Sequence, residues 1–183
     1  MISPTGGQRR IFMIHSYYNP KLMTNTKGFG NHLPVLIKLV SLTTGPILEL
    51  GGGMFSTPFL HWACYPNRRL VTYDNEEMYF NTIKQYECDY HKVELVTDWD
   101  KVDVSGHWDI VLVDHHPNER RVEEVKRLVN TADYLVLHDT EGRWDGKYHY
   151  STIYPLFKYR WDFSTGQRPF TTVLSNLKDL KGL

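Results

Sequence analysis

Three consecutive glycines, Gly51, Gly52 and Gly53, follow a short apolar run that contains Glu49. Glycine has no Cβ, so a turn of this kind lets the backbone approach a bound molecule closely. Asp74 ends the next apolar run about 20 residues later, where a carboxylate can accept hydrogen bonds from both hydroxyls of a ribose. Together they predict a site for a nucleoside-containing cofactor, at a spacing that NAD-binding domains also use.

Two later apolar runs end in groups that could do chemistry, Asp114-His115-His116 and His138-Asp139-Thr140. The carboxyl ends of parallel strands meet at one edge of a sheet, where ligands collect, so we expect both motifs to face one pocket. His138 is equally well explained as a core histidine with its polar atoms paired. A two-histidine, one-carboxylate iron site is an alternative. It would draw on His115, His116, His138 and His149 with Asp114 and Asp139, but the β-rich scaffold usual for such sites is not predicted.

Short apolar runs alternate with helical patterns from Pro46 onward, which predicts a parallel sheet with helices on both faces. The runs expected to form its strands are PILEL, RLVTY, KVELV, DIVLV and DYLVLH. RWDFST and FTTVLSN are joined by too short a link for a helical crossover, so they predict a C-terminal antiparallel hairpin. A chain of 183 residues suits a single α/β domain over 1–183, with an arm or lid over 1–30 and a core over 31–183.

Local signals place the helices. We expect one over residues 32–43, one capped by Asn75, one opening at Pro117 and one near Thr152. The apolar stripes expected to face the core are Leu33, Leu36, Ile37 and Val40 in the first helix, Met78, Tyr79, Thr82, Ile83 and Tyr86 in the second, and Val122, Val125, Leu128 and Val129 in the third.

Two cysteines, Cys64 and Cys88, each fall in a predicted helix, and we expect both to be reduced core thiols. Residues 141–148 are polar and aromatic and contain two glycines, so we expect a mobile loop over the substrate.

The segment Glu49-Leu50-Gly51-Gly52-Gly53 resembles motif I of class I S-adenosylmethionine (SAM)-dependent methyltransferases, in which an acidic residue precedes a Gly-x-Gly turn. The resemblance covers roughly residues 30–176 and implies a Rossmann-like fold with a mostly parallel seven-stranded sheet ending in an antiparallel hairpin. It also implies that Asp98 binds the adenine amino group and that Trp99 lies near the ring. Ser56 replaces the third glycine of the dinucleotide fingerprint, which a cofactor without a pyrophosphate tolerates. The implied cofactor residues are Glu49, Gly51, Gly52, Gly53, Ser56, Asp74, Asn75, Asp98, Trp99, Asp114 and His115.

The later motifs resemble the small-molecule and sugar O-methyltransferase branch of this family, in which Asp-His after the fourth strand and Asp after the fifth hold a divalent cation. Asp114, Asp139 and the Thr140 hydroxyl could supply oxygen ligands to Mg²⁺. Thr140 stands where the catechol-type enzymes have Asn, and no lysine follows Asp114-His115 to act as base. His116 is the nearest substitute base and His138 the second candidate, so the predicted catalytic residues are His116, Asp114, Asp139 and His138.

A hydroxyl of a small molecule or sugar is therefore the predicted methyl acceptor, and Tyr17, Tyr18, His32, Trp144 and Tyr148 could stack on its ring. Two alternatives remain open. One is another SAM-using enzyme on this scaffold, such as an aminopropyltransferase. The other is a non-catalytic cofactor-binding subunit.

Composition excludes other classes of function. The chain has 21 basic and 21 acidic side chains, so we expect no nucleic-acid partner. Its apolar runs are far shorter than the roughly 20 residues that cross a bilayer, so we expect no membrane association and a cytoplasmic protein. A homo-oligomer is possible.

Overall fold

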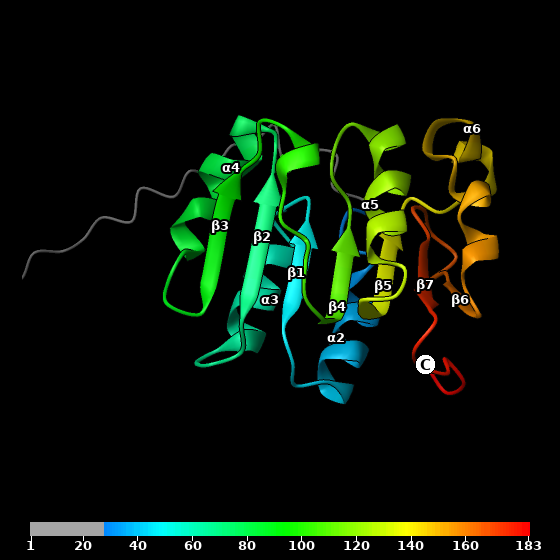
Figure 1. The fold of residues 1–183 in the computed structure, drawn as a ribbon, viewed down its shortest axis with the longest axis horizontal. Coiled ribbons are helices and arrows are strands. Elements are labelled where there is room, and N and C mark those ends of the chain that lie inside the picture. Colours follow the sequence, from blue (N-terminus) through cyan, green and yellow to red (C-terminus); the bar gives the residue numbers. More distant parts are fainter. Residues whose placement is uncertain (1–27) are drawn as a thin grey trace, which may run out of the picture.

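A computed structural model of the protein describes residues 28–183, and Figure 1 shows a twisted sheet with helices on its two faces. The sheet has seven strands in the order β3-β2-β1-β4-β5-β7-β6. The strands are β1 Ile47–Leu50, β2 Leu70–Asp74, β3 His91–Leu95, β4 Trp108–Val113, β5 Ala132–His138, β6 Tyr159–Phe163 and β7 Thr171–Ser175. Strands β1 to β5 are parallel to one another, whereas β7 is antiparallel to both β5 and β6. The predicted fold class is confirmed, including the terminal hairpin.

The helices are short and lie between the strands. They are α2 Leu33–Leu42, α3 Ser56–Cys64, α4 Glu77–Ile83, α5 Arg121–Leu128 and α6 Asp145–Tyr148, with 3-10 turns at Lys84–Tyr86, Trp99–Lys101, Asn118–Arg120, Gly142–Trp144, Tyr150–Thr152 and Tyr154–Leu156. Within residues 28–183, no helix has the length and apolar character needed to cross a bilayer.

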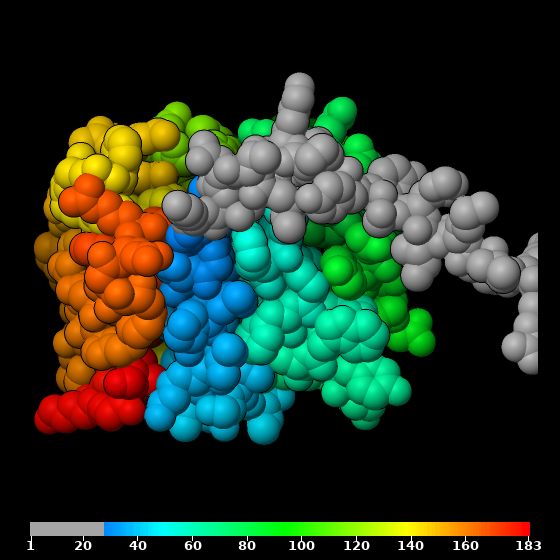
Figure 2. Space-filling view, turned by 180° about the vertical axis from the view of Figure 1, so that it is seen from behind, coloured from blue at the N-terminus to red at the C-terminus, as the bar shows by residue number. Residues whose placement is uncertain are grey.

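Alternate side chains of each strand point to opposite faces, which divides the core into two clusters. On one face Leu48, Val111 and Leu135 pack with Val125 of α5 and Tyr150. On the other face Ile47, Ile110 and Val136 pack with Leu36 of α2 and Leu60 of α3. Figure 2 shows this face, with α2 lying across it beside α3. Each face of the sheet is therefore covered by helices, as the alternation of patterns predicted.

Several local predictions are wrong, and each error has a physical cause. Asn75 does not cap the second helix, because α4 begins at Glu77 and the Asp74 carboxylate accepts the Glu76 N–H at 2.7 Å. Only Ile83 is buried in that helix, and Met78 is 46% exposed. Ile37 of α2 is 54% exposed, because Val35, Leu36 and Leu39 form the buried stripe.

The predicted helix near Thr152 is also absent, since residues 150–156 form two separate 3-10 turns. The predicted loop over 141–148 instead contains the turn Gly142–Trp144 and α6. Pro117 precedes a 3-10 turn, and α5 begins four residues later at Arg121. Cys64 is buried as expected, but Cys88 is exposed and lies outside any helix, beside an isolated bridge to His91.

Candidate cofactor and acceptor pocket

The strand order puts the start of the site between β1 and β4. The chain leaves β1 toward β2 and β3, and returns to place β4 on the other side of β1, so the loops after β1 and β4 diverge and leave a crevice. Two backbone hydrogen bonds fix this edge: Gly51 N–H donates to Tyr73 O at 2.8 Å, and Asp114 N–H donates to Leu50 O at 2.7 Å. The glycine loop, Asp74 and Asp114 therefore lie at one edge of the sheet.

The three glycines of the loop have different functions. Gly51 has φ +95°, and a Cβ there would lie 2.5 Å from the Asp114 carbonyl carbon. A Cβ at Gly52 would lie 2.1 Å from Ile83 Cδ1, whereas one at Gly53 would meet only Ser56 Oγ, at 3.6 Å. Gly51 and Gly52 thus allow the loop to pack against protein. Gly53 is the position at which a missing side chain leaves room for a ligand.

Glu49 lies beneath this loop, fully buried. Its Oε2 accepts hydrogen bonds from the hydroxyls of Thr57 and Thr72, each at 2.8 Å, and Thr57 Oγ1 in turn accepts the Gly53 N–H at 2.9 Å. Burial raises the pKa of Glu49 to about 7. Glu49 therefore holds the loop in place through Thr57, and its side chain does not line the pocket.

Asp74 at the end of β2 is 3% exposed and does line the pocket. Burial raises its pKa to about 6, although the Glu76 N–H that it accepts works in the opposite direction. Its position on the second strand is the one predicted for a ribose-binding carboxylate.

One pocket contains most of the predicted cofactor residues. Those that line it are Gly51, Gly52, Gly53, Ser56, Asp74, Asp114 and His115. Residues outside the predicted set of site residues also line it, namely Phe29, Met54, Phe55, Glu76, Tyr79, Asn118 and Arg121.

Asp98, Trp99 and Asn75 are not among the lining residues. Asp98 accepts the Asp100 N–H at 3.0 Å and pairs with Lys101 Nζ at 3.0 Å. Trp99 is buried and stacks on the His115 ring at 4.0 Å between centroids, and its Nε1–H donates to His116 O at 2.9 Å. Trp99 therefore supports the Asp114-His115-His116 turn from below.

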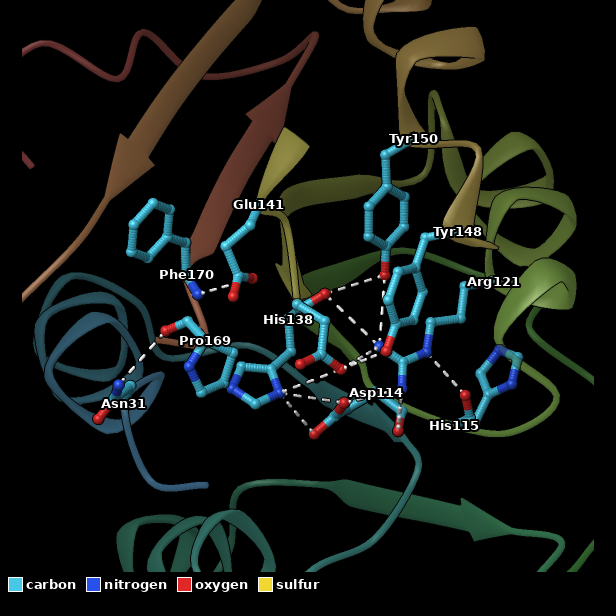
Figure 3. Close-up of polar contacts among 11 residues, drawn as sticks. Asn31, Asp114, His115, Arg121, His138, Glu141, Tyr148, Tyr150, Pro169 and Phe170 are labelled. Carbon is cyan, nitrogen blue, oxygen red and sulfur yellow. Dashed lines mark hydrogen bonds and ion pairs between the residues drawn. The ribbon is translucent and has the colours of Figure 1, made fainter. Parts of the chain in front are cut away.

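Arg121 joins the ends of β4 and β5, and only 2% of its surface is exposed. Its Nη2 lies 3.0 Å from Asp114 Oδ1 and its Nη1 lies 3.2 Å from Asp139 Oδ2. It also donates to His115 O at 2.7 Å and to Asp114 O at 2.9 Å (Figure 3). Burial alone would lower the pKa of Arg121, but Tyr150, Asp114 and Asp139 raise it above its ordinary value. The Arg121 guanidinium thus forms ion pairs with both carboxylates that were predicted to be catalytic, those of Asp114 and Asp139.

The sequence contained a signal for Arg121. Arg121, Val125 and Leu128 have the i, i+4, i+7 spacing of a helix stripe that faces the core, and all three are buried. An arginine within an apolar stripe indicates a buried, paired charge.

The predicted Mg²⁺ ligands do not form an oxygen-only site. Asp114 and Asp139 both face the Arg121 guanidinium, and Tyr148 donates its hydroxyl to Asp139 Oδ2 at 2.9 Å. The Thr140 hydroxyl accepts a hydrogen bond from Thr172 at 2.9 Å. A monovalent cation of the protein itself therefore stands where Mg²⁺ was expected, and these residues do not fit that ion.

His138 and His32 stand next to Asp114 in the pocket wall. His138 Nδ1 lies 3.2 Å from Asp114 Oδ1, and the rings of His32 and His138 meet edge to face with centroids 4.8 Å apart. Burial would lower the pKa of His138, but Asp114 raises it, whereas burial and His138 lower the pKa of His32 to about 4. Burial would likewise raise the pKa of Asp114, but His138 and Arg121 hold it below its usual range. His116 lines the same pocket with an exposed side chain.

The predicted acceptor residues are only partly brought together. Tyr17 and Tyr18 lie outside the described residues. Tyr148 is buried and lines the pocket, but Trp144 is 41% exposed and does not. His149 is exposed and away from the pocket, so the iron-site set that included it is not assembled.

No protein-family model and no curated protein sequence matches the chain, but solved structures do. Cofactor-bound Rv0187 from MTB superposes with a TM-score of 0.65 at 15% identity, covering 82% of this chain and 80% of that one. The fold is a Rossmann-like methyltransferase fold. The O-methyltransferase TomG from Streptomyces achromogenes, in complex with SAM, gives a TM-score of 0.58 at 14% identity, over 78% and 77% of the two chains. The N-terminal domain of human METTL16, in complex with S-adenosylhomocysteine (SAH), gives a TM-score of 0.54 at 11% identity, over 80% of this chain and 69% of that one.

Proposed function

We propose that the protein is a SAM-dependent methyltransferase that methylates a hydroxyl of a small molecule or sugar. The observation that carries this proposal is that the glycine loop, Asp74 and the His-Asp cluster at the ends of β4 and β5 line a single pocket of this fold. Solved neighbours of the same fold, TomG and METTL16, hold SAM or SAH. No part of the proposal requires Mg²⁺.

The cofactor would lie along the glycine loop. Gly53 leaves space at the loop surface, and Asp74 offers a carboxylate at the position for the ribose hydroxyls. Ser56 lines the pocket at the start of α3. Asp74, Glu76, Asp114 and Asp139 all line the pocket, so carboxylates outnumber its cationic groups, Arg121 and His138, and favour the sulfonium of SAM. Asp98, Trp99 and Asn75 stay predictions as cofactor residues.

The acceptor would lie against the histidines. Transfer of the methyl group from sulfur to a hydroxyl oxygen forms the C–O bond, breaks the S–C bond and releases the hydroxyl proton. We assign receipt of that proton to His116, because its exposed side chain lines the pocket and can pass the proton to water. Asp114 and His138 hold the acceptor oxygen, and Arg121, which also pairs with Asp139, fixes the Asp114 carboxylate.

The acceptor class also follows from charge. With equal numbers of basic and acidic side chains, the chain lacks the basic excess that binds phosphate backbones, so the acceptor is proposed to be neutral and small. A homo-oligomer and a cytoplasmic location stay predictions.

The experiment is incubation with methyl-labelled SAM and a panel of catechols, sugars and glycosides, followed by product analysis. Label in the acceptor together with SAH is expected. Methylthioadenosine would instead indicate transfer of the 3-amino-3-carboxypropyl group of SAM or, with decarboxylated SAM as donor, of the aminopropyl group. Bound SAH with no turnover on any acceptor would favour a non-catalytic subunit.

A matched pair of variants tests the base. His116→Ala should lower turnover by about 100-fold or more while SAH still binds. His107→Ala is the control, because His107 is 53% exposed and precedes β4 at the opposite end of that strand from the pocket. Equal activity of the two variants would remove His116 from the mechanism.

A further inference from the structure

Three side chains in the pocket wall bring metal-binding atoms together. His32, Asp114 and His138 each offer a ligand atom within 4.8 Å of the other two. They come from the residue before α2, the residue after β4 and the last residue of β5, so only the fold brings them close. Ligands around a tetrahedral ion lie roughly 2.0–2.2 Å from it. Small rotations of the side chains would bring these atoms onto one ion.

A second, independent feature is a set of buried ring nitrogens with no partner among the described residues. Both nitrogens of His32 and Nε2 of His138 are of this kind. His32 is 2% exposed and His138 is 4% exposed. An unpaired buried polar atom costs about 1–3 kcal/mol, so buried polar atoms are rarely left without a partner. Two adjacent imidazoles with free nitrogens beside a carboxylate indicate a ligand that accepts electron pairs.

We propose that His32, His138 and Asp114 bind a divalent transition-metal ion, of which Zn²⁺ is the representative. Two imidazoles and one carboxylate suit Zn²⁺, Co²⁺ or Fe²⁺, whereas Mg²⁺ prefers an oxygen shell. The site differs from the oxygen set Asp114, Asp139 and Thr140, in which Arg121 contacts both carboxylates, because only one of its three ligand side chains, Asp114, contacts Arg121.

The surroundings match those of a metal site with an open position. Arg121 contacts Asp114 through Oδ1, whereas Asp114 Oδ2 lies 3.2 Å from His138 Nδ1 and therefore faces the histidine with which it would share the ion. Hydrogen bonds of this kind orient ligating carboxylates in metal sites. All three side chains line the pocket, so an ion held by them would face the space in which the acceptor is proposed to bind. The link to the acceptor rests on the proposed function, but metal binding itself does not.

The test uses the full chain, stripped of metal with a chelator and titrated with Co²⁺ and, separately, with Zn²⁺. One Co²⁺ per chain is expected, with the visible absorption of a four- or five-coordinate ion, and Zn²⁺ should displace it. Zn²⁺ should also raise the melting temperature, because an ion that binds only the folded state stabilises it. Mg²⁺ at the same concentration should give no shift.

Variants locate the ion. His32→Ala and His138→Gln should each weaken Co²⁺ binding by roughly 100-fold. His116→Ala, which changes a pocket histidine outside the cluster, should leave Co²⁺ binding unchanged. His107→Ala tests a second candidate group, formed by His107, Asp109 and Asp133, and should also leave it unchanged. Within residues 28–183, the His32 side chain makes no hydrogen bond, so His32→Ala gives the cleaner result if His138→Gln fails to fold.

Three outcomes would overturn the proposal: no stoichiometric Co²⁺ binding by the wild-type chain, binding unaffected by His32→Ala, or binding lost in His107→Ala. Calorimetry with SAH on the same samples separates this proposal from the proposed function. Co²⁺ binding without SAH binding would support the metal site and contradict the proposed methyltransferase function. SAH binding without Co²⁺ binding would overturn the metal site and leave the proposed methyltransferase function standing.

Discussion

The two halves of the pocket are built differently. The cofactor half is one continuous stretch of chain, β1 and the glycine loop, held by Gly51 against the Asp114 backbone and by Glu49 from below. The acceptor half gathers His32, Asp114, Arg121 and His138 from separate elements, and these meet through charged contacts with Asp114 and the edge-to-face packing of the two histidine rings. Local packing therefore fixes the first half. The second depends on long-range pairing of buried charges.

The largest expected effect tests that dependence. Arg121→Met removes the buried cation between Asp114 and Asp139 and leaves two carboxylates uncompensated. Breaking a buried pair of this kind costs about 3–5 kcal/mol of the free energy of unfolding. Chemical denaturation measures it. Adding Asp139→Asn to the variant should restore part of the loss, and a double variant no more stable than Arg121→Met would contradict the pairing.

Two glycine substitutions test the local half. Gly51→Ala places a Cβ 2.5 Å from backbone atoms at φ +95°, so it should lower the free energy of unfolding by about 3 kcal/mol. Gly53→Ala meets only Ser56, at 3.6 Å, and should change stability by less than about 1 kcal/mol while weakening SAH binding. Denaturation and calorimetry on both variants separate the two roles. Equal losses of stability would contradict this division.

The pH dependence of stability tests Glu49. Burial raises its pKa in the folded protein from 4.5 to about 7, so its stabilising contribution is complete below pH 4.5 and is lost as the pH rises through 7. Glu49→Gln removes this group and leaves neighbouring Asp74 and His91 in place. Between pH 5 and pH 8 the wild type should lose on the order of 3 kcal/mol relative to the variant. Parallel stability curves would show that Glu49 keeps an ordinary pKa.

The smallest effect compares two carboxylates predicted to bind the cofactor. Asp74→Ala should weaken SAH binding about tenfold or more, because Asp74 lines the pocket. Asp98→Ala should change it by less than about threefold, because the Asp98 side chain is 39% exposed and pairs with Lys101. A large effect at Asp98 would mean that this loop rearranges onto the adenine.

The contrast between the halves also explains what could be predicted from the sequence. The strands and the glycine loop follow from apolar runs and turn residues, which are local signals, whereas the seven-stranded sheet was implied by the resemblance to class I methyltransferases. Asp74, Asp114 and His115 were found because each lies at the end of a strand or directly after it. His32 and His138 are far apart in the sequence, and only the folded sheet brings their rings into contact. Arg121 is indicated in the sequence only as a charged residue within an apolar helix stripe.

The errors concern turns and helix ends, whose geometry the apolar patterns do not predict. Asp98 and Trp99 follow β3 in the expected order, but turn geometry directs the Asp98 carboxylate to its own backbone and Lys101. Cys88 was placed in a helix by its neighbours, although the chain ends that helix with a 3-10 turn at Lys84–Tyr86. Element positions are thus predictable from apolar patterns, whereas the direction of a loop side chain depends on turn geometry that those patterns do not contain.

Calorimetric titration of the folded chain with SAH tests most directly whether the glycine loop and Asp74 form a cofactor site. One SAH per chain is predicted, with a Kd in the micromolar range and with binding lost in Gly53→Val, whose side chain would fill the space at the loop. No heat from well-folded wild-type protein, or equal heat from the Gly53→Val variant, would contradict the account.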